Sequence, residues 1–247
     1  MWEFEIICDR QNSTYISTIQ ERLKPILNEV NGVFAIMADE ENVYLSLGCE
    51  QKKSHIVKAN IRLAIADIIC ENLKFEFLNN HLEFICEDES FKFALAKVCT
   101  YFDSELDRQI VLQSLDLKTK KINLDSFFYF KLSSLKQKWQ ELCNITNKNS
   151  VTILRQHNFA ELLKFLLSNI DKKCQSVILE MKEKCLIYHD INKDFDIITA
   201  IEPHNKIEVL GKLIELNPYL IKIYPDKKND DTISLLQTVF DDRVVLA

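Results

Sequence analysis

The sequence predicts an α/β protein with a small N-terminal unit of strand, helix and hairpin, a helical middle, and a C-terminal α/β unit with parallel strands. Near both ends of the chain, apolar residues alternate with polar ones, which is the period of half-buried strands. In the middle they recur every three to four residues, as on one face of a helix. Only three Gly and four Pro occur in 247 residues, which favours helix over tight turns. We expect the three units to occupy residues 1–49, 50–173 and 174–247.

The N-terminal unit shows both periods. Its first strand alternates apolar residues with glutamates, and the following helical stretch contains Pro25, where a kink or an early end is expected. Two apolar runs then flank the polar loop 39–42, which indicates a β-hairpin. The expected elements are a strand over 2–6, a helix over 14–30, and strands over 33–38 and 43–47.

The helical middle begins with an apolar period over 54–73, for which Ser54 is the expected N-cap. The stretch 75–86 fits two structures, because its last apolar residues alternate as in a strand while its whole length fits a helical stripe; we favour the helix. The stretch Glu87-Asp-Glu-Ser90 would begin the next helix, since negative charge is favoured at a helix N-terminus. The remaining expectations are a helical extension through 106–115, a bend over 144–150 and a helix from His157.

The densest aromatic cluster lies at 122–142, and we expect the middle to be organised around it. Five large apolar residues recur there at steps of four and three, so they share one face of a single helix. Asp125 or Ser126 would cap its start. Phe127 and Phe130 fall on a second face, which predicts that the first turn is buried nearly all round. The five residues of the main stripe are Phe128, Leu132, Leu135, Trp139 and Leu142.

The same stretch resembles the YtxC-like sporulation protein family of endospore-forming bacteria, through a motif I-N-L-x-x-F-x-x-F-[KR]-L followed by a Trp. The matching residues are Ile122, Asn123, Leu124, Phe127, Phe130, Lys131, Leu132 and Trp139. Residues 159–165 and 236–245 resemble a later helix and the C-terminal end of that family. The chain departs from the family at Ser126, often Gly there, and at Leu246-Ala247, which replace a tail with Gly and Cys. The resemblance implies a role in sporulation and supplies no catalytic residues.

The C-terminal unit returns to a period of two. Its strand, helix, strand spacing implies parallel neighbours joined by a right-handed crossover. The expected elements are a hairpin of 177–181 and 186–188, a strand over 197–201, a helix over 206–216 ended by Asn217-Pro218, a strand over 220–224, a helix over 232–240 capped by Asp230-Asp231, and a last strand over 243–246.

The composition is that of an ordinary globular protein, with 47% hydrophobic and 28% charged residues. The chain begins Met-Trp-Glu-Phe-Glu, without the basic and apolar regions of a secretory signal. No uninterrupted apolar run is long enough to cross a bilayer. These features predict a cytoplasmic protein without a membrane span.

Eight cysteines raise the question of metal binding or disulfides, but no two are separated by the two to four residues of a ligand pair. Most lie within apolar periods, so we expect buried thiols that pack as small hydrophobic residues. In a reducing cytoplasm the thiol is also the stable form. We therefore expect neither a metal site nor a disulfide.

Candidate catalytic residues are few. His189-Asp190 and Glu202-Pro-His204 each place an imidazole near a carboxylate, which acid–base chemistry or metal binding could use. Both lie at expected strand ends, where polar turn residues are common without a function. Asp230-Asp231 and Asp241-Asp242 fit a helix cap and a solvated turn better than metal ligands. Three glycines cannot supply a phosphate-binding loop, and we predict no catalytic, cofactor-binding or metal-binding residue and no cofactor.

Charge is uneven along the chain. Segment 116–173 holds ten Lys and one Arg against five acidic residues, a net charge of +6 in a chain of net charge −6. Such a segment could hold nucleic-acid phosphates or an acidic lipid surface. Its cations are scattered over several expected elements, however, and its aromatics lie on the buried stripe rather than between the charges. A solvated lysine-rich face is therefore the favoured interpretation.

We expect a non-enzymatic structural or interaction protein connected with sporulation, with an unidentified protein as its partner. The alternative is a nucleic-acid-binding protein that uses the basic segment 116–173. A hydrolase that uses His189 and His204 is the third hypothesis.

Overall fold

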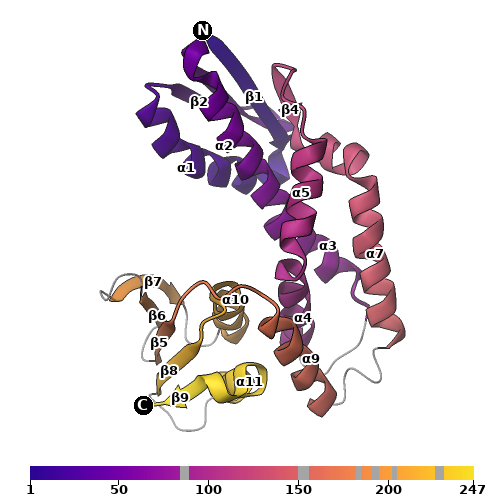
Figure 1. Cartoon of the computed structure of the whole chain (residues 1–247), viewed down its shortest axis with the longest axis vertical. Coiled ribbons are helices and arrows are strands. Elements are labelled where there is room, and N and C mark those ends of the chain that lie inside the picture. The colour runs from indigo at the N-terminus through magenta and orange to yellow at the C-terminus, as the bar shows by residue number, and fades with distance from the viewer. Residues whose placement is uncertain (84–88, 150–155, 182–184, 191–194, 202–204, 226–230) are drawn as a thin grey trace. The chain divides into compact units, whose positions relative to one another are not determined.

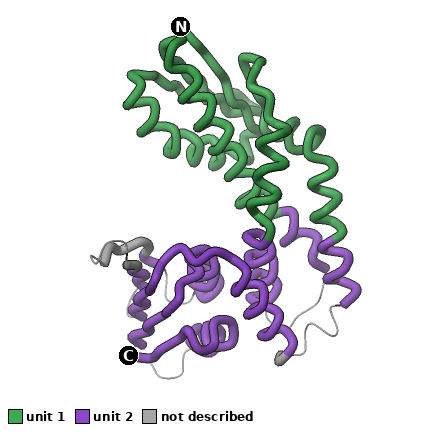
Figure 2. The backbone as a smooth tube through the Cα atoms, viewed as in Figure 1, with its two compact units in different colours: residues 1–76, 103–141 green, residues 77–102, 142–247 purple. Residues whose placement is uncertain are grey.

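The structure, a computed structural model, describes residues 1–83, 89–149, 156–181, 185–190, 195–201, 205–225 and 231–247. Within these ranges the chain is an α/β protein, as predicted, with strands toward both ends of the sequence and helices between them (Figure 1). The chain divides into two compact units (Figure 2). Unit 1 comprises Met1–Glu76 and Asp103–Glu141, and unit 2 comprises Phe77–Phe102 and Leu142–Ala247. Each unit contains part of the segment 50–173, which was expected to form a helical middle.

The sheet of unit 1 has four strands in the order β2-β3-β1-β4. Strand β3 pairs antiparallel with both β1 and β2, whereas β1 and β4 are parallel. The predicted N-terminal order of strand, helix and hairpin is confirmed, but the short strand β4 was not expected. The strands are β1 (Trp2–Asp9), β2 (Val33–Ala38), β3 (Asn42–Cys49) and β4 (Lys121–Asn123).

Helices cover one face of this sheet. Helix α1 packs against β1 and β3, and α2 packs against α1 and α5 (Figure 1). Helix α1 continues past Pro25, so the early end considered for it is wrong. Ser54 does not cap α2 because its hydroxyl donates to the carbonyl of Gln51 at 2.8 Å, in the preceding turn. The elements are η1 (Arg10–Asn12), α1 (Ser13–Glu29), η2 (Gln51–Lys53), α2 (Ser54–Asp67), the π-helix η3 (Ile68–Leu73) and α5 (Ser104–Ser114).

The core of unit 1 follows the two sequence periods. Every second residue of β1 and β3 is buried beneath the helices, and α1 contributes a stripe with the helical period. The other face of the strands carries polar residues such as Glu3, Glu5 and Ser46. The buried residues include Phe4, Ile6, Cys8, Ile16, Ile19, Leu23, Leu27, Val43, Leu45 and Leu47.

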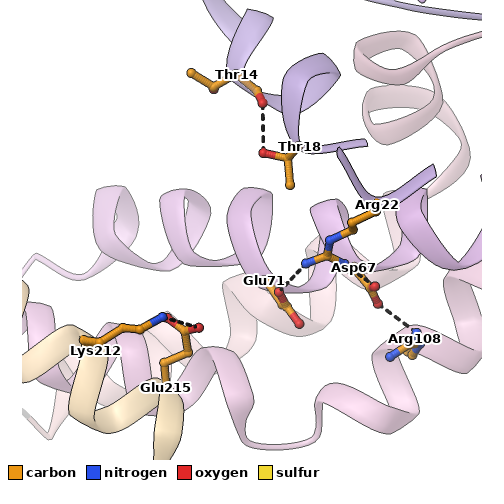
Figure 3. A network of polar contacts seen from close by, with 8 residues as sticks. All are labelled: Thr14, Thr18, Arg22, Asp67, Glu71, Arg108, Lys212 and Glu215. Atoms are coloured by element: carbon orange, nitrogen blue, oxygen red, sulfur yellow. Dashed lines mark hydrogen bonds and ion pairs between the residues drawn. The ribbon is translucent and has the colours of Figure 1, made fainter. Parts of the chain in front are cut away.

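A surface network joins three helices of unit 1 (Figure 3). Arg22 of α1 contacts Asp67 at the end of α2, and its Nη2 lies 3.3 Å from Glu71 Oε2. Arg108 Nη2 of α5 lies 2.9 Å from Asp67 Oδ1. Burial raises the pKa of Asp67 above its ordinary value, although Arg108 and Arg22 act in the opposite direction. The network therefore links elements far apart in sequence around one half-buried carboxylate.

The central aromatic stretch is not one helix. It is divided into β4, α6 (Leu124–Ser126), the π-helix η4 (Phe127–Lys131) and α7 (Ser133–Lys148), with a break at Leu132, where φ is −108° and ψ is 28°. The predicted stripe is nevertheless confirmed as buried, with Leu142 half-buried. Phe130 is 78% exposed, so the prediction of an all-round buried first turn is wrong. The wider π turn and the break shift the angular position of Phe130 relative to a regular helix.

The N-cap of this stretch is also not the expected residue. Asn123 caps α6, because its Oδ1 accepts a hydrogen bond from Ser126 N at 2.7 Å. Asp125 instead accepts hydrogen bonds from Asp9 N at 2.7 Å and Asn12 Nδ2 at 2.8 Å. The carboxylate that was expected to cap the helix thus connects α6 to the end of β1.

Unit 2 contains most of the remaining helices. The stretch 75–86 is helical as far as His81, as favoured, and 84–88 lie outside the described residues. The bend expected over 144–150 is wrong for 144–148, because α7 continues through them with Cys143 and Thr146 buried. The helices are α3 (Lys74–His81, shared with unit 1), α4 (Glu89–Tyr101), α9 (Gln156–Ser168), α10 (Lys206–Leu216), α11 (Asp231–Phe240) and η5 (Asp241–Arg243).

The sheet of unit 2 has five strands in the order β7-β6-β5-β8-β9. The β5–β6 hairpin is antiparallel, and β8 is parallel to both β5 and β9. The predicted parallel neighbours are therefore confirmed. The strands are β5 (Ser176–Met181), β6 (Cys185–Asp190), β7 (Phe195–Ile201), β8 (Leu220–Pro225) and β9 (Val244–Leu246).

Asn217 ends α10, as predicted, and it also holds α9. It is fully buried and left-handed, with φ of 40°. Its Nδ2 donates to the carbonyls of Leu167 and Ile170 at 3.0 and 2.8 Å, and its Oδ1 accepts from Arg243 at 2.8 Å. Asn tolerates this conformation better than most residues, and its side-chain amide supplies a donor to two buried carbonyls near the end of α9.

Candidate functional site

The residues considered for acid–base chemistry are only partly within the described structure. His189 and Asp190 lie in β6, but their side chains are outside the described part, as are Glu202, His204 and Asp230. Asp231 is the first residue of α11. Asp241 lies 2.7 Å from Lys164 Nζ in an ion pair. Among the described residues, no group of three His, Cys, Asp or Glu side chains is arranged to hold a metal ion.

The cysteines are mainly core residues. Cys8, Cys49, Cys70, Cys99, Cys143 and Cys185 are buried, which confirms the prediction for these positions; Cys86 lies outside the described residues. Burial raises the pKa of the Cys8 and Cys70 thiols to about 12 and that of Cys143 to about 11. Because the thiolate is the nucleophile, these three thiols are poor candidates for catalysis.

The most unusual buried group is Asp107 of α5, whose side chain is fully buried. Its Oδ2 lies 2.7 Å from Nζ of Lys74, which is itself 2% exposed, and accepts the Trp139 indole N–H at 3.0 Å. Its Oδ1 lies 3.0 Å from Lys138 Nζ. Both carboxylate oxygens thus have donors within unit 1, and we call these four residues the Asp107 cluster.

The Asp107 cluster explains why the indole of Trp139 belongs to the core. A buried carboxylate is costly unless it is paired and hydrogen-bonded, and here an ammonium group and an N–H donor satisfy the same oxygen. The ring of Trp139 also packs beside Phe128, with centroids 6.1 Å apart. The cluster therefore connects the start of α3 with α5 and α7, which points to a structural role.

The basic segment 116–173 is divided between the two units. Several of its lysines lie beside anions or aromatic rings of the same unit. The ion pairs are Lys118 with Asp116 (3.6 Å), Lys138 with Asp107 (3.0 Å) and Lys164 with Asp241 (2.7 Å). Lys172 and Lys173 lie 4.5 and 4.9 Å from the ring centroids of Tyr219 and Tyr101. This arrangement does not favour one continuous phosphate-binding surface.

The strongest candidate for a functional surface is the edge strand β2, of sequence Val-Phe-Ala-Ile-Met-Ala. All six residues are exposed, although none is polar. The exposed fractions are 59% for Val33, 36% for Phe34, 43% for Ile36 and 57% for Met37. An exposed Leu or Ile by itself is ordinary, but a contiguous apolar strand at a sheet edge is a feature of interaction sites.

The backbone of β2 is also open toward one side. Asp39 N donates to the carbonyl of Asn42 at 3.0 Å and closes the β2–β3 hairpin. Because hydrogen-bonded pairs alternate along an antiparallel ladder, every second residue counted back from Asp39, including Ala35, bonds to β3. The N–H and C=O groups of Phe34 and Ile36 consequently point to the free edge, and no other strand of the described chain lies there.

The opposite edge of the same sheet is different. Strand β4 has three residues; Lys121 is its first residue and Lys120 precedes it, and both lysines are exposed. Short edge strands and lysines are the usual means by which proteins prevent edge-to-edge association. Strand β2 is twice as long and carries neither device. The sheet is thus protected at one edge and open at the other.

A shallow hollow of about 410 Å³ adjoins β2 on the sheet face that the helices do not cover. Its lining combines apolar groups of β2 with charged side chains from the neighbouring strands. Gly48 keeps the floor open, because a Cβ there would lie 3.1 Å from Met1 Cε and 3.4 Å from Val33 Cγ2. The lining includes Met1, Glu3, Glu5, Val33, Ala35, Gly48, Lys120 and Lys121. A strand added to β2 would have this hollow beside it.

Sequence reasoning located β2 as a hairpin strand but not its exposure. An uninterrupted apolar run is typical of a strand buried on both faces, so the composition of 33–38 predicts a buried strand and not an exposed one. The useful signal is the contrast with β3 and β1, whose alternation shows that one sheet face is open to solvent.

No helix of the described part is both long and apolar enough to span a membrane. Comparison with models of known protein families, with curated proteins and with solved structures gives no match to this chain.

Proposed function

We propose that this chain is a non-enzymatic, cytoplasmic interaction protein of sporulation, which binds another polypeptide through the β2 edge. The observation that carries the proposal is β2, a strand of six uncharged residues that are all exposed. An extended segment that adds to such an edge gains main-chain hydrogen bonds from Phe34 and Ile36 and buries the apolar side chains beside them. The unprotected edge is then a binding site that a partner completes.

The non-enzymatic part of the proposal is supported by how the buried polar groups are used. Asp107 has donors on both oxygens from Lys74, Lys138 and Trp139, in a packed cluster. The thiols of Cys8 and Cys70 are kept protonated by burial. These groups have the properties of core residues rather than of a reaction centre.

The connection with sporulation rests on the resemblance of the 122–139 motif to the YtxC-like family. The motif residues Leu124, Phe127, Leu132 and Trp139 are buried. They stabilise unit 1, which also carries β2. The resemblance therefore concerns the scaffold, and the proposed interaction uses an edge of that scaffold.

The proposal is tested with two lysine variants in a sporulating host. Ile36→Lys places a charge on the β2 edge, where a buried ammonium group would oppose strand addition. Leu63→Lys is the matched control, because Leu63 is 41% exposed on α2 and Ile36 is 43% exposed on β2. Each variant, and the unchanged chain, replaces the chromosomal copy as an affinity-tagged protein.

Two measurements are made in these strains: the yield of heat-resistant spores, and the polypeptides that co-purify with the tag, including untagged chain supplied from a second gene copy. We expect the unchanged chain and Leu63→Lys to support spore formation and to recover the same polypeptides, and Ile36→Lys to lose both. Equal spore yield and equal recovery for all three proteins would contradict a role for β2. Full spore yield without the chain would contradict the role in sporulation.

A further inference from the structure

We infer that the polypeptide bound at the β2 edge is a second copy of this chain, in a two-fold symmetric dimer that joins two four-stranded sheets edge to edge. The inference rests on the proposed function and names the partner at the same site. It is carried by three properties of β2: its side-chain register, the direction of its free backbone groups and the charges at its two ends.

The alternation of side chains limits how β2 can pair with itself. Two antiparallel copies related by a two-fold axis perpendicular to the sheet have opposite residues on the same face. Since β2 residues alternate between the two faces, the axis must pass beside a single residue, which then lies opposite its own copy. The two central candidates are Ala35 and Ile36.

The register centred on Ala35 places only apolar residues opposite one another. Val33 then lies opposite Met37 of the second copy, Phe34 opposite Ile36, and Ala35 opposite Ala35. A register centred on Ile36 would instead place Val33 opposite Asp39, whose carboxylate accepts hydrogen bonds within its own hairpin. The Ala35 register is therefore the more complementary one.

The free backbone groups fit the same register. Phe34 and Ile36 direct N–H and C=O groups to the open edge, so two opposite Phe34–Ile36 pairs can exchange main-chain hydrogen bonds. Ala35 and its copy then form the close, non-hydrogen-bonded pair on the axis. Helix α1 lies over β1 and β3 and leaves Phe34 and Ile36 partly uncovered, so their side chains are available to pack across the junction.

Opposite charges lie at the two ends of β2. The hairpin loop Asp39–Glu41 follows its end, accompanied by Arg10, whose Nη1 donates to the Asp39 carbonyl at 2.8 Å. Just before its start, Lys53 Nζ donates to the Val30 carbonyl at 3.2 Å, and Lys52 and Glu50 line a hollow together with Val33. Antiparallel pairing brings the acidic loop of one copy to the lysines of the other.

This charge pattern selects a second copy over an arbitrary strand. The chain has a net charge of −6, so two copies repel each other in general, and an edge that nevertheless pairs with itself benefits from local attraction at both ends. A junction of two short strands is smaller than the roughly 1,200–2,000 Å² of a standard interface. We therefore expect a reversible dimer with a Kd on the order of 1–100 µM.

The first test is analytical ultracentrifugation of the full chain over a concentration series up to about ten times that Kd. The unchanged chain and Leu63→Lys should dimerise, while Ile36→Lys should associate at least about 100-fold more weakly, because it would bury unpaired charge. A chain that remains monomeric throughout, or an Ile36→Lys variant that dimerises as well as Leu63→Lys, would overturn the inference.

The second test fixes the register and does not depend on a disruptive variant. Residues of a non-hydrogen-bonded pair have Cα atoms about 4.5 Å apart, within disulfide range. Ala35→Cys should therefore form a covalent dimer under mild oxidation. Ala38→Cys should not, because residue 38 of one copy lies opposite residue 32 of the other, six residues away from the second cysteine. Crosslinking of Ile36→Cys without Ala35→Cys, or of neither, would contradict the Ala35-centred dimer.

These outcomes are separable from the proposed function. A monomeric chain whose recovered polypeptides still disappear with Ile36→Lys has a foreign partner at β2, so the dimer is wrong and the proposed function stands. A monomeric chain whose polypeptides and spore yield are unaffected by Ile36→Lys contradicts both.

Discussion

Two regions of unit 1 reverse the usual distribution of polar and apolar groups. The Asp107 cluster places a carboxylate and the ammonium group of Lys74 in the interior. Strand β2 places Val33, Phe34, Ile36 and Met37 at the surface. Buried charge and contiguous exposed apolar surface are the two deviations that carry most information in a globular protein.

The difference between them lies in where their partners are. Water cannot reach Asp107, so its partners must come from the same chain, and Lys74, Lys138 and Trp139 supply them. The free N–H and C=O groups of β2 can be hydrated while its edge stays open. The cluster is thus complete within one chain, whereas β2 can be completed by another. Changes in the cluster should reduce stability, and changes in β2 should reduce association.

The largest expected effect is that of Asp107→Ala. It leaves the ammonium group of Lys74 buried without its carboxylate, which should reduce the free energy of unfolding by about 3–5 kcal/mol. Urea unfolding followed by circular dichroism measures the change. Asp116→Ala is the control, because the exposed carboxylate of Asp116 forms a surface ion pair with Lys118 and accepts a hydrogen bond from Lys118 N at 3.0 Å, so its loss should change stability little. Equal midpoints for the two variants would mean that the cluster does not stabilise unit 1.

Two substitutions of Trp139 distinguish the contribution of its packing from that of its hydrogen bond to Asp107. Trp139→Ala should cost about 3–5 kcal/mol, because it leaves a large cavity. Trp139→Phe keeps much of the ring but removes the N–H that Asp107 accepts, and should cost about 1–3 kcal/mol. Thermal and urea unfolding of both variants give the two values. A Phe variant as unstable as the Ala variant would show that the hydrogen bond dominates over packing.

Ile36→Lys should leave the stability of unit 1 almost unchanged, unlike the changes at Asp107 and Trp139. Its side chain is 43% exposed and its backbone groups face the open edge, so the substitution should change the free energy of unfolding by no more than about 0.5 kcal/mol. The measurement is urea unfolding at a concentration well below the dimer Kd. A decrease in the free energy of unfolding above about 2 kcal/mol would mean that Ile36 is a core residue and that β2 is not a candidate interaction surface.

How much of the fold and of the candidate site the sequence predicts depends on how far apart in the sequence the interacting residues lie. The hairpin of β2 and β3 follows from an apolar pattern and a polar loop, both local, and it is confirmed. The burial of Leu132, Leu135 and Trp139 likewise follows from helical spacing. These predictions hold because a period of two or of three to four residues reports directly on which face is covered.

The missed features depend on contacts distant in sequence. Asp107 and Lys74 are separated by more than one helix, and no local pattern pairs them. Asp125 was expected to cap a helix, but the end of β1, more than a hundred residues earlier, takes its carboxylate. Phe130 is exposed because η4 changes the helical phase, which a regular period cannot show.

The smallest expected effect concerns the basic segment 116–173, the surface that would compete with β2 for the functional role. We expect no binding of duplex DNA or single-stranded RNA in a mobility-shift titration at low salt, because several of its lysines are paired within their own unit. Binding through six or more phosphate contacts would have to weaken by about 10³-fold or more between roughly 50 and 200 mM salt.

The decisive variant changes Lys118, Lys131 and Lys148 to Glu and leaves Lys138 in place, because Lys138 belongs to the Asp107 cluster. All three chosen side chains are exposed, so the fold should be retained. Micromolar binding by the unchanged chain that this variant loses would make the basic segment the functional surface. In that case Ile36→Lys should leave nucleic-acid binding untouched, and β2 would need another explanation. Without such binding, the exposed strand remains the surface of unit 1 that a partner has most to gain from covering, because it offers apolar side chains and free hydrogen-bonding groups together.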